Sequence, residues 1–175
     1  MLFRSKEAGY NGEKIVLLGA GDLFHHNAVA QVTAENLKKI GLNVDLQMSD
    51  WGAVITRRGK KDGPYQGGYH IFQTFSDGVG GMSPLTNISV GTGCDGKNWF
   101  GWPCDEDLEK IRMVDFEGVT SPEQGKQVAD RYQTRFYQSV PLVPLGQFTQ
   151  PVVYRKNISG VLTGTRVVLW NLEKK

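Results

Sequence analysis

The sequence predicts an α/β fold in which helices flank a sheet. A continuous apolar run over residues 14–18 ends at a glycine and is typical of a buried strand. A helix is expected from about His26 to Ile40, because apolar residues recur at helical spacing and Gly41 follows at the position of a left-handed C-cap. Residues 43–48 alternate polar and apolar, which predicts a second strand with one wet face. This strand–helix–strand order implies a parallel pair with a right-handed crossover.

The next elements follow the same logic. The apolar face of the first helix is expected to consist of Val29, Val32, Leu37 and Ile40. A short helix is expected over residues 51–58 and a third strand over residues 69–75. Residues 76–103 are rich in glycine and show little periodicity. A long stretch of that kind in a compact domain is usually functional, unless the assignment is wrong.

Helix signals return in the last third of the chain. Asp105 can cap a helix that carries Leu108, Ile111 and Val114. A second helix has a clear start, with Ser121 as N-cap, Pro122 at the first position and Gln124 at the capping-box position, and it should run to Pro141. Closing strands are expected at residues 142–147, 152–154 and 167–170.

Composition limits the class of protein. A chain of 175 residues with 39% hydrophobic and 22% charged residues fits one soluble domain or a large piece of a bigger protein. The net charge of +2 argues against nucleic-acid binding, which needs clustered Lys and Arg. Such a cluster occurs at residues 57–61, and most of it is interpreted as a solvated helix end.

The N-terminus and the cysteines indicate the cellular compartment of the protein. No stretch reaches the roughly 18 apolar residues of a membrane span, and residues 1–7 lack the apolar core of a signal peptide. The chain therefore begins in the cytosol, or it is part of a longer chain whose secretion signal lies elsewhere. Cys94 and Cys104, the only cysteines, suit neither a zinc site nor a redox motif. A disulfide between them is favoured over two free thiols and would imply an oxidising compartment.

Two candidate sites have simpler explanations. The turn at Gly19, Gly21 and Asp22 joins a strand to a helix, as in dinucleotide-binding proteins, but Phe24 occupies the third glycine position. A plain strand-to-helix turn is the better interpretation, with a small Rossmann-like enzyme domain as the alternative. His25 and His26 with Asp22 resemble metal ligands, yet adjacent histidines on a helix point in different directions, so an exposed helix start is expected instead.

No catalytic arrangement is visible in the sequence. The carboxylates at residues 105–109 lie at a helix N-terminus, where they favour the helix dipole. The run from Gly93 to Cys104 is a Gly/Pro loop that holds Trp99, Phe100 and Trp102. Aromatic walls with a few charged groups are typical of a ligand-binding pocket. The prediction is therefore a binder, with no catalytic residues, no cofactor and no metal.

The order of several motifs resembles a known family. The motifs are residues 7–12 (EAGYNG), 39–44 (KIGLNV), Asp50 with Trp51, Arg57 with Arg58, 98–103 (NWFGWP), 142–147 (LVPLGQ), 157–161 (NISGV) and 169–171 (LWN). In that order they resemble the C-terminal lobe of peptide/nickel-type solute-binding proteins of ABC importers. The resemblance spans nearly the whole chain. It implies a three-layer lobe of the type II periplasmic-binding-protein kind with a mixed sheet, formed by residues 1–175.

The resemblance also implies a ligand site. Trp51, Phe75 and Trp99 would form its aromatic walls, Arg58 would meet a peptide carboxylate, and Asp77 would meet the peptide amine. Phe75 stands where relatives usually have a tryptophan, and the glycines at residues 78–81 shift the register, which leaves other small solutes open as ligands.

The expected function is capture of a peptide or similar small solute between two lobes, followed by delivery to a membrane permease. Family members are longer and have two lobes, so the chain is expected to lack the N-terminal lobe, with Met1 an introduced start. The location would be periplasmic, or lipid-anchored outside a Gram-positive cell. An isolated lobe should bind its ligand weakly and, because its inner face is uncovered, should self-associate.

Overall fold

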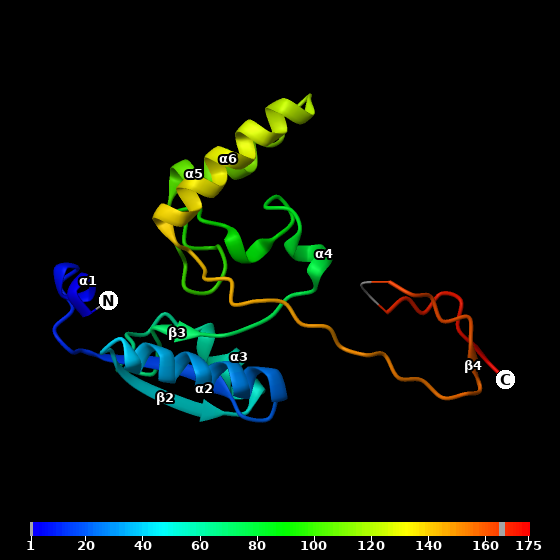
Figure 1. The fold of residues 1–175 in the computed structure, drawn as a ribbon, viewed down its shortest axis with the longest axis horizontal. Coiled ribbons are helices and arrows are strands. Elements are labelled where there is room, and N and C mark those ends of the chain that lie inside the picture. Colours follow the sequence, from blue (N-terminus) through cyan, green and yellow to red (C-terminus); the bar gives the residue numbers. More distant parts are fainter. Residues whose placement is uncertain (1, 165–166) are drawn as a thin grey trace. The chain divides into compact units, whose positions relative to one another are not determined.

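The computed structural model describes residues 2–164 and 167–175. The chain forms two compact units, residues 1–75 and 76–175 (Figure 1). The first unit is built on a parallel sheet, and the second combines helices with long irregular segments. The part of the chain that the structure describes contains no helix that is both long and apolar enough to cross a membrane.

The first unit alternates strands and helices as the sequence predicts. Its elements are α1 (Leu2–Glu7), β1 (Lys14–Ala20), α2 (Phe24–Lys39), β2 (Asn43–Ser49), α3 (Trp51–Arg58) and β3 (Ile71–Phe72). The three strands are parallel in the order β2-β1-β3, and β1 pairs with β2 along its whole length. The third strand is shorter than expected. Gln73 leaves the sheet, and its amide donates a hydrogen bond of 2.6 Å to the Thr33 hydroxyl on α2.

Helices cover both faces of this sheet, which confirms the α/β class. Val16, Leu18 and Ala20 alternate along β1 and form one buried cluster with Val54 of α3. The intervening Gly19 lies against Ala30 of α2, on the opposite face. The unit therefore has three layers, with α2 and α3 on opposite faces of the sheet.

The buried face of α2 differs from the expected one. Its buried residues are His26, Ala30 and Ala34, whereas Val29 and Val32 are 36% and 59% exposed. The reason is the close approach of helix and sheet, because a Cβ added at Gly19 would lie 2.9 Å from the Ala30 Cβ. Only small side chains fit that contact, so the valines are turned outward.

The second unit has short helices and a long one. Its elements are α4 (Gly78–Gly81), the 3-10 turn η1 (Ile88–Val90), α5 (Glu106–Lys110), the π-helical turn η2 (Ile111–Asp115), α6 (Pro122–Ser139), β4 (Ile158–Ser159) and β5 (Glu173–Lys174). Both predicted caps are confirmed. Asp105 accepts from the Leu108 N–H at 3.0 Å, and Ser121 accepts from the Gln124 N–H at 3.2 Å.

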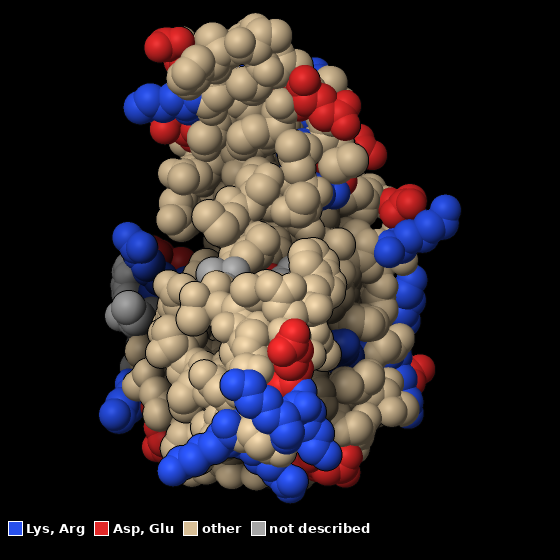
Figure 2. Space-filling model, turned by 90° about the vertical axis from the view of Figure 1, so that its right-hand side faces the viewer, with Lys and Arg blue, Asp and Glu red and all other residues tan. Residues whose placement is uncertain are grey.

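The three predicted closing strands are wrong. Residues 142–147, 152–154 and 167–170 carry no strand, and the pairing that does occur is the short antiparallel contact of β4 with β5. Most of their apolar side chains are exposed, Val153 to 89% and Trp170 to 90%. Without a neighbouring strand within the described residues, an alternating pattern has nothing to pair with. Figure 2 shows that uncharged residues form much of the face it draws.

Candidate ligand-binding site

Trp51 lies at the end of the sheet where the strands of the first unit finish. The arrowhead of β2 points to the end of the sheet at which α2 begins (Figure 1). Asp50 caps α3 by accepting from the Ala53 N–H at 2.9 Å, and the Trp51 N–H donates to an Asp22 carboxylate oxygen at 2.8 Å. Asp22 follows β1 and Asp50 follows β2, so both turns fix the start of α3. Ligands in open α/β sheets bind at this edge.

An aromatic cluster continues from Trp51. The imidazole of His26 lies 4.7 Å from the Trp51 ring and 4.9 Å from the Phe75 ring, measured between centroids. His26 is only 5% exposed, so the expectation of an exposed helix start is wrong for this residue. The cause is its position on the α2 face that packs on the sheet. Burial lowers the pKa of His26, and nearby Asp22 partly offsets this shift.

Arg58 joins the same cluster from the end of α3. Its guanidinium carbon lies 5.5 Å from the Trp51 centroid, within the range of a cation–π contact. The structure therefore brings together Arg58, Trp51 and Phe75, three of the five predicted ligand residues, through the rings of Trp51 and His26. Arg57 is only half-buried but is held by three hydrogen bonds, so it is not the solvated side chain expected from the basic cluster.

Asp77 and Trp99, the other two predicted ligand residues, belong to the second unit. Asp77 is exposed and caps α4, accepting from the Gly80 N–H at 2.8 Å. The half-buried Trp99 ring lies 4.9 Å from that of Phe100. Asp77 therefore acts as a helix cap in the second unit.

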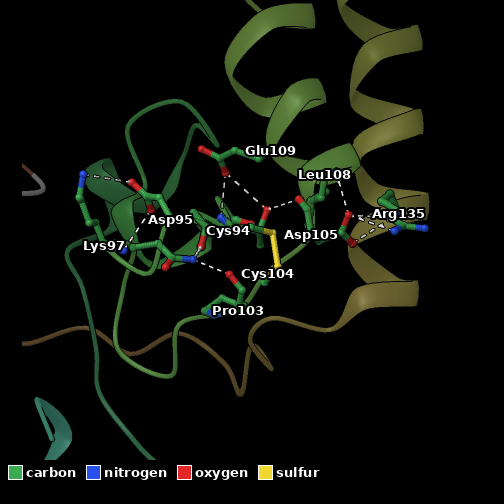
Figure 3. The surroundings of a disulfide bond; sticks show 12 residues. Cys94, Asp95, Lys97, Pro103, Cys104, Asp105, Leu108, Glu109 and Arg135 are labelled. Carbon is green, nitrogen blue, oxygen red and sulfur yellow. Dashed lines mark hydrogen bonds and ion pairs between the residues drawn. A yellow bond between two sulfur atoms is a disulfide. The ribbon is translucent and has the colours of Figure 1, made fainter. Parts of the chain in front are cut away.

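The loop that carries Trp99 is closed at its base. Cys94 and Cys104 form the predicted disulfide, with an S–S distance of 2.08 Å (Figure 3). Beside it, the Asp105 N–H donates to the Thr92 carbonyl at 2.8 Å, and the Thr92 hydroxyl donates to the Asp105 carbonyl at 3.0 Å. Inside the loop, the Asn98 amide donates to the Pro103 carbonyl. These bonds fix the loop from both ends.

A charged network anchors the loop base to the helices. The Arg135 guanidinium donates to Asp105, whose side chain is 5% exposed (Figure 3). Burial opposes ionisation of Asp105, but hydrogen bonds from Arg135 and from the Leu108 N–H prevail and lower its pKa. Glu109 accepts from Arg112 and from the Thr92 N–H, and the Arg112 hydrogen bond is the main cause of its lowered pKa. The acidic residues of this helix therefore do more than favour its dipole.

The structure gives no support to a nucleotide site at the turn after β1 or to a metal site within the described residues. Gly19 is needed for packing, since an added Cβ would lie 2.9 Å from the Ala30 Cβ, and Asp22 is engaged with the Trp51 backbone. Both features of the turn thus have a structural explanation without a nucleotide. No group of three potential ligands among His, Cys, Asp and Glu could hold a metal ion within residues 2–164 and 167–175.

Sequence reasoning missed His26 as a member of the site. The signal that could have found it is the spacing His26, Ala30, Ala34, a small-residue stripe that marks the buried face of α2. If that stripe is the buried face, His26 lies on it at the N-terminal end of α2, beside the start of α3.

Comparison with known proteins gives the family context. No family model matches the chain. The chain is 38% identical over 169 residues to a probable peptide ABC transporter periplasmic-binding protein of Sinorhizobium fredii, a match that covers 97% of this chain and 32% of that protein. It therefore spans about a third of the length of this curated relative.

One solved structure shows the fold, and a second aligns less well. A dipeptide-binding protein from Pseudoalteromonas sp. SM9913, in complex with Met-Leu, matches with a TM-score of 0.68 at 20% identity, covering 99% of this chain and 35% of that one. The oligopeptide-binding protein AppA of Bacillus subtilis, in complex with a nonapeptide, aligns over 73% of this chain and 24% of that one, with 16% identity and a TM-score of 0.44. By sequence, this chain is thus similar to about a third of a peptide ABC transporter periplasmic-binding protein, and by fold it is similar to part of a dipeptide-binding protein.

Proposed function

We propose that the protein is the solute-binding component of an ABC importer and captures a peptide or similar small solute outside the cytoplasm. The observation that carries the proposal is the 38% identity over 97% of the chain to a peptide ABC transporter periplasmic-binding protein. The protein acts by binding rather than by catalysis, and it delivers its ligand to a membrane permease.

The proposed ligand contacts are aromatic rings and two charged groups. In the first unit, Trp51 and Phe75 supply aromatic walls and Arg58 pairs with a ligand carboxylate. In the second unit, Trp99 is proposed as a further aromatic contact and Asp77 as the partner of a ligand amine. Two features support this assignment: Arg58 already stacks on Trp51 at the ligand-binding edge of the sheet, and Phe75 is 54% exposed.

The proposed capture takes place between two lobes, and the chain matches only 32% of its relative. We infer that the remaining length of the protein supplies that lobe and that closure of the two lobes buries the ligand. Weak peptide binding by this chain alone, and its self-association, remain predictions, which calorimetry and sedimentation at high concentration test.

The proposal is tested by peptide binding to the intact protein that carries this chain, with a randomised pool of short peptides as the probe. Asp77→Asn is the informative variant, because asparagine caps a helix as well as aspartate and the substitution removes only the charge. We expect tight peptide binding by the unaltered protein and about tenfold weaker binding by D77N.

Asp130→Asn is the matched control, since it removes the same charge from an exposed pair with Lys126 on α6. D130N should bind as the unaltered protein does. Absence of peptide binding by the unaltered protein would contradict the proposed function. Equal affinity of D77N and D130N would remove Asp77 from the site but leave the function intact.

A further inference from the structure

His26 is a buried polar residue in the aromatic cluster. It lies in the first turn of α2, after the carboxyl end of β1. The strand order β2-β1-β3 makes the chain cross from one side of β1 to the other, so the topological switch point lies between β1 and β3. In sheets of this kind the ligand crevice lies at that point, outside the carboxyl ends of the strands.

The Nε2 atom of His26 is buried and has no hydrogen-bond partner among the described residues. Its ring neighbours are Trp51 at 4.7 Å and Phe75 at 4.9 Å, and neither ring contact is a hydrogen bond. A buried polar atom without a partner costs free energy, and most such atoms in proteins are satisfied. Leucine or methionine at position 26 would fill the same space without that cost.

We infer that His26 contacts the ligand directly, through a hydrogen bond from its imidazole to a neutral amide of a bound peptide, in a subsite between Trp51 and Phe75. This inference rests on the proposed function, because it names a residue of the same site. It adds a polar contact to a pocket whose other first-unit members are two aromatic rings and Arg58.

The neighbouring charges select a neutral ligand group. Asp22 lies close enough to influence His26 and disfavours an anion there. The guanidinium of Arg58, 5.5 Å from the Trp51 ring, disfavours a cation on the other side of the cluster. A neutral imidazole has one donor and one acceptor nitrogen, which complements the N–H and C=O of an amide.

The ligand reaches His26 by displacing one side chain. Phe75 is the last residue of the first unit, lies outside β3 and is 54% exposed. Rotation of an exposed side chain is fast, in the picosecond to nanosecond range. Turning the Phe75 ring away uncovers one side of the imidazole, while the Trp51 backbone is held by its N–H bond to Asp22.

The test compares His26→Leu and His26→Gln with His25→Leu in the intact protein. His25 lies in the same helical turn, but its ring contact is with Phe24. The probe is the member of a randomised peptide pool that the unaltered protein binds most tightly. Thermal unfolding without peptide is measured beside the affinity.

A ligand contact predicts that H26L keeps or raises the melting temperature yet binds the peptide about tenfold more weakly. H26Q, which retains a donor and an acceptor, should recover part of the affinity, and H25L should bind normally. Unchanged affinity in H26L would overturn the inference while the proposed function stands. Failure of the unaltered protein to bind any peptide would overturn both.

A second measurement covers the case in which H26L does not fold. The ¹⁵N resonances of the unaltered imidazoles are recorded with and without the same peptide. A shift of the His26 Nε2 resonance, larger than any shift at His25, supports the contact. An unmoved His26 resonance at saturating peptide overturns it.

Discussion

Arg58 lies against Trp51, with its guanidinium carbon 5.5 Å from the indole centroid, while the preceding Arg57 is used in a different way. Arg57 donates to the Gln47 side chain at 2.5 Å and to the carbonyls of Gly67 and Gly68 at 2.8 Å each. It thereby ties the loop before β3 to β2. Two consecutive arginines at the end of one helix thus make different contacts: Arg57 binds backbone and side-chain acceptors, and Arg58 lies over an aromatic ring.

These different contacts predict that substitution of Arg57 lowers mainly stability and that substitution of Arg58 lowers mainly peptide affinity. Arg57→Gln should lower the free energy of unfolding by about 1–3 kcal/mol, because it leaves partly buried acceptors without donors. Arg58→Gln should cost less than about 1 kcal/mol of stability but weaken peptide binding, because the carboxylate contact is lost. Urea unfolding and calorimetry measure the two effects. Equal losses of stability and affinity in both variants would contradict this prediction.

The disulfide is predicted to stabilise the aromatic loop. Breaking Cys94–Cys104 should lower the free energy of unfolding by about 2–3 kcal/mol, because the unfolded chain regains the freedom of a short closed loop. Both cysteines are exposed, so a thiol reductant can reach them. The measurement is urea unfolding with and without reductant. The double variant Cys94→Ser/Cys104→Ser is the control and should not respond to reductant. A reductant effect of equal size in that variant would refute this explanation.

Asp105 is predicted to be the most sensitive acidic residue of the second unit. Asp105→Ala removes both the α5 cap and the partner of Arg135, and should cost about 3–5 kcal/mol of stability. Asp105→Asn should cost less, because asparagine keeps the cap. Urea unfolding of both variants decides the point, and equal losses would mean that the cap contributes nothing.

The Asp105 carboxyl also gives a pH dependence. Its pKa is lower in the folded protein than the unfolded value of about 3.9. Its contribution is therefore complete above that value and disappears as the pH falls through the folded pKa. We expect D105N to flatten the acid limb of the stability curve.

Much of the fold follows from local sequence signals. The bounds of α3 match the predicted residues 51–58, and the caps Asp105 and Ser121 act as expected, because a cap depends only on the next few residues. The parallel pair β1–β2 was likewise predictable, since one uninterrupted apolar strand and a crossover helix leave few alternatives.

The sequence predictions are wrong where the structure depends on contacts between residues far apart in the sequence. The outward turn of Val29 and Val32 depends on how closely Gly19 meets Ala30, a contact between two elements. The apolar alternation of residues 142–147 and 152–154 has the pattern of strands, but a strand exists only beside a partner. In the candidate site, aromatic residues in a loop were visible in the sequence, whereas the burial of His26 depended on the packing of α2.

His26 predicts a pH dependence of definite sign. Burial lowers its pKa, Asp22 offsets the shift in part, and His25 adds to it. The unfolded chain therefore takes up a proton near pH 6.5, while the folded chain does so only at lower pH. The free energy of unfolding is then at its full value above about pH 7 and declines as the pH falls toward 5.

Urea unfolding across this range should show the decline in the unaltered chain and in His25→Leu. In His26→Leu the free energy of unfolding should change less over this pH range, because position 26 no longer titrates. If H26L leaves the pH dependence unchanged, the effect belongs to another group.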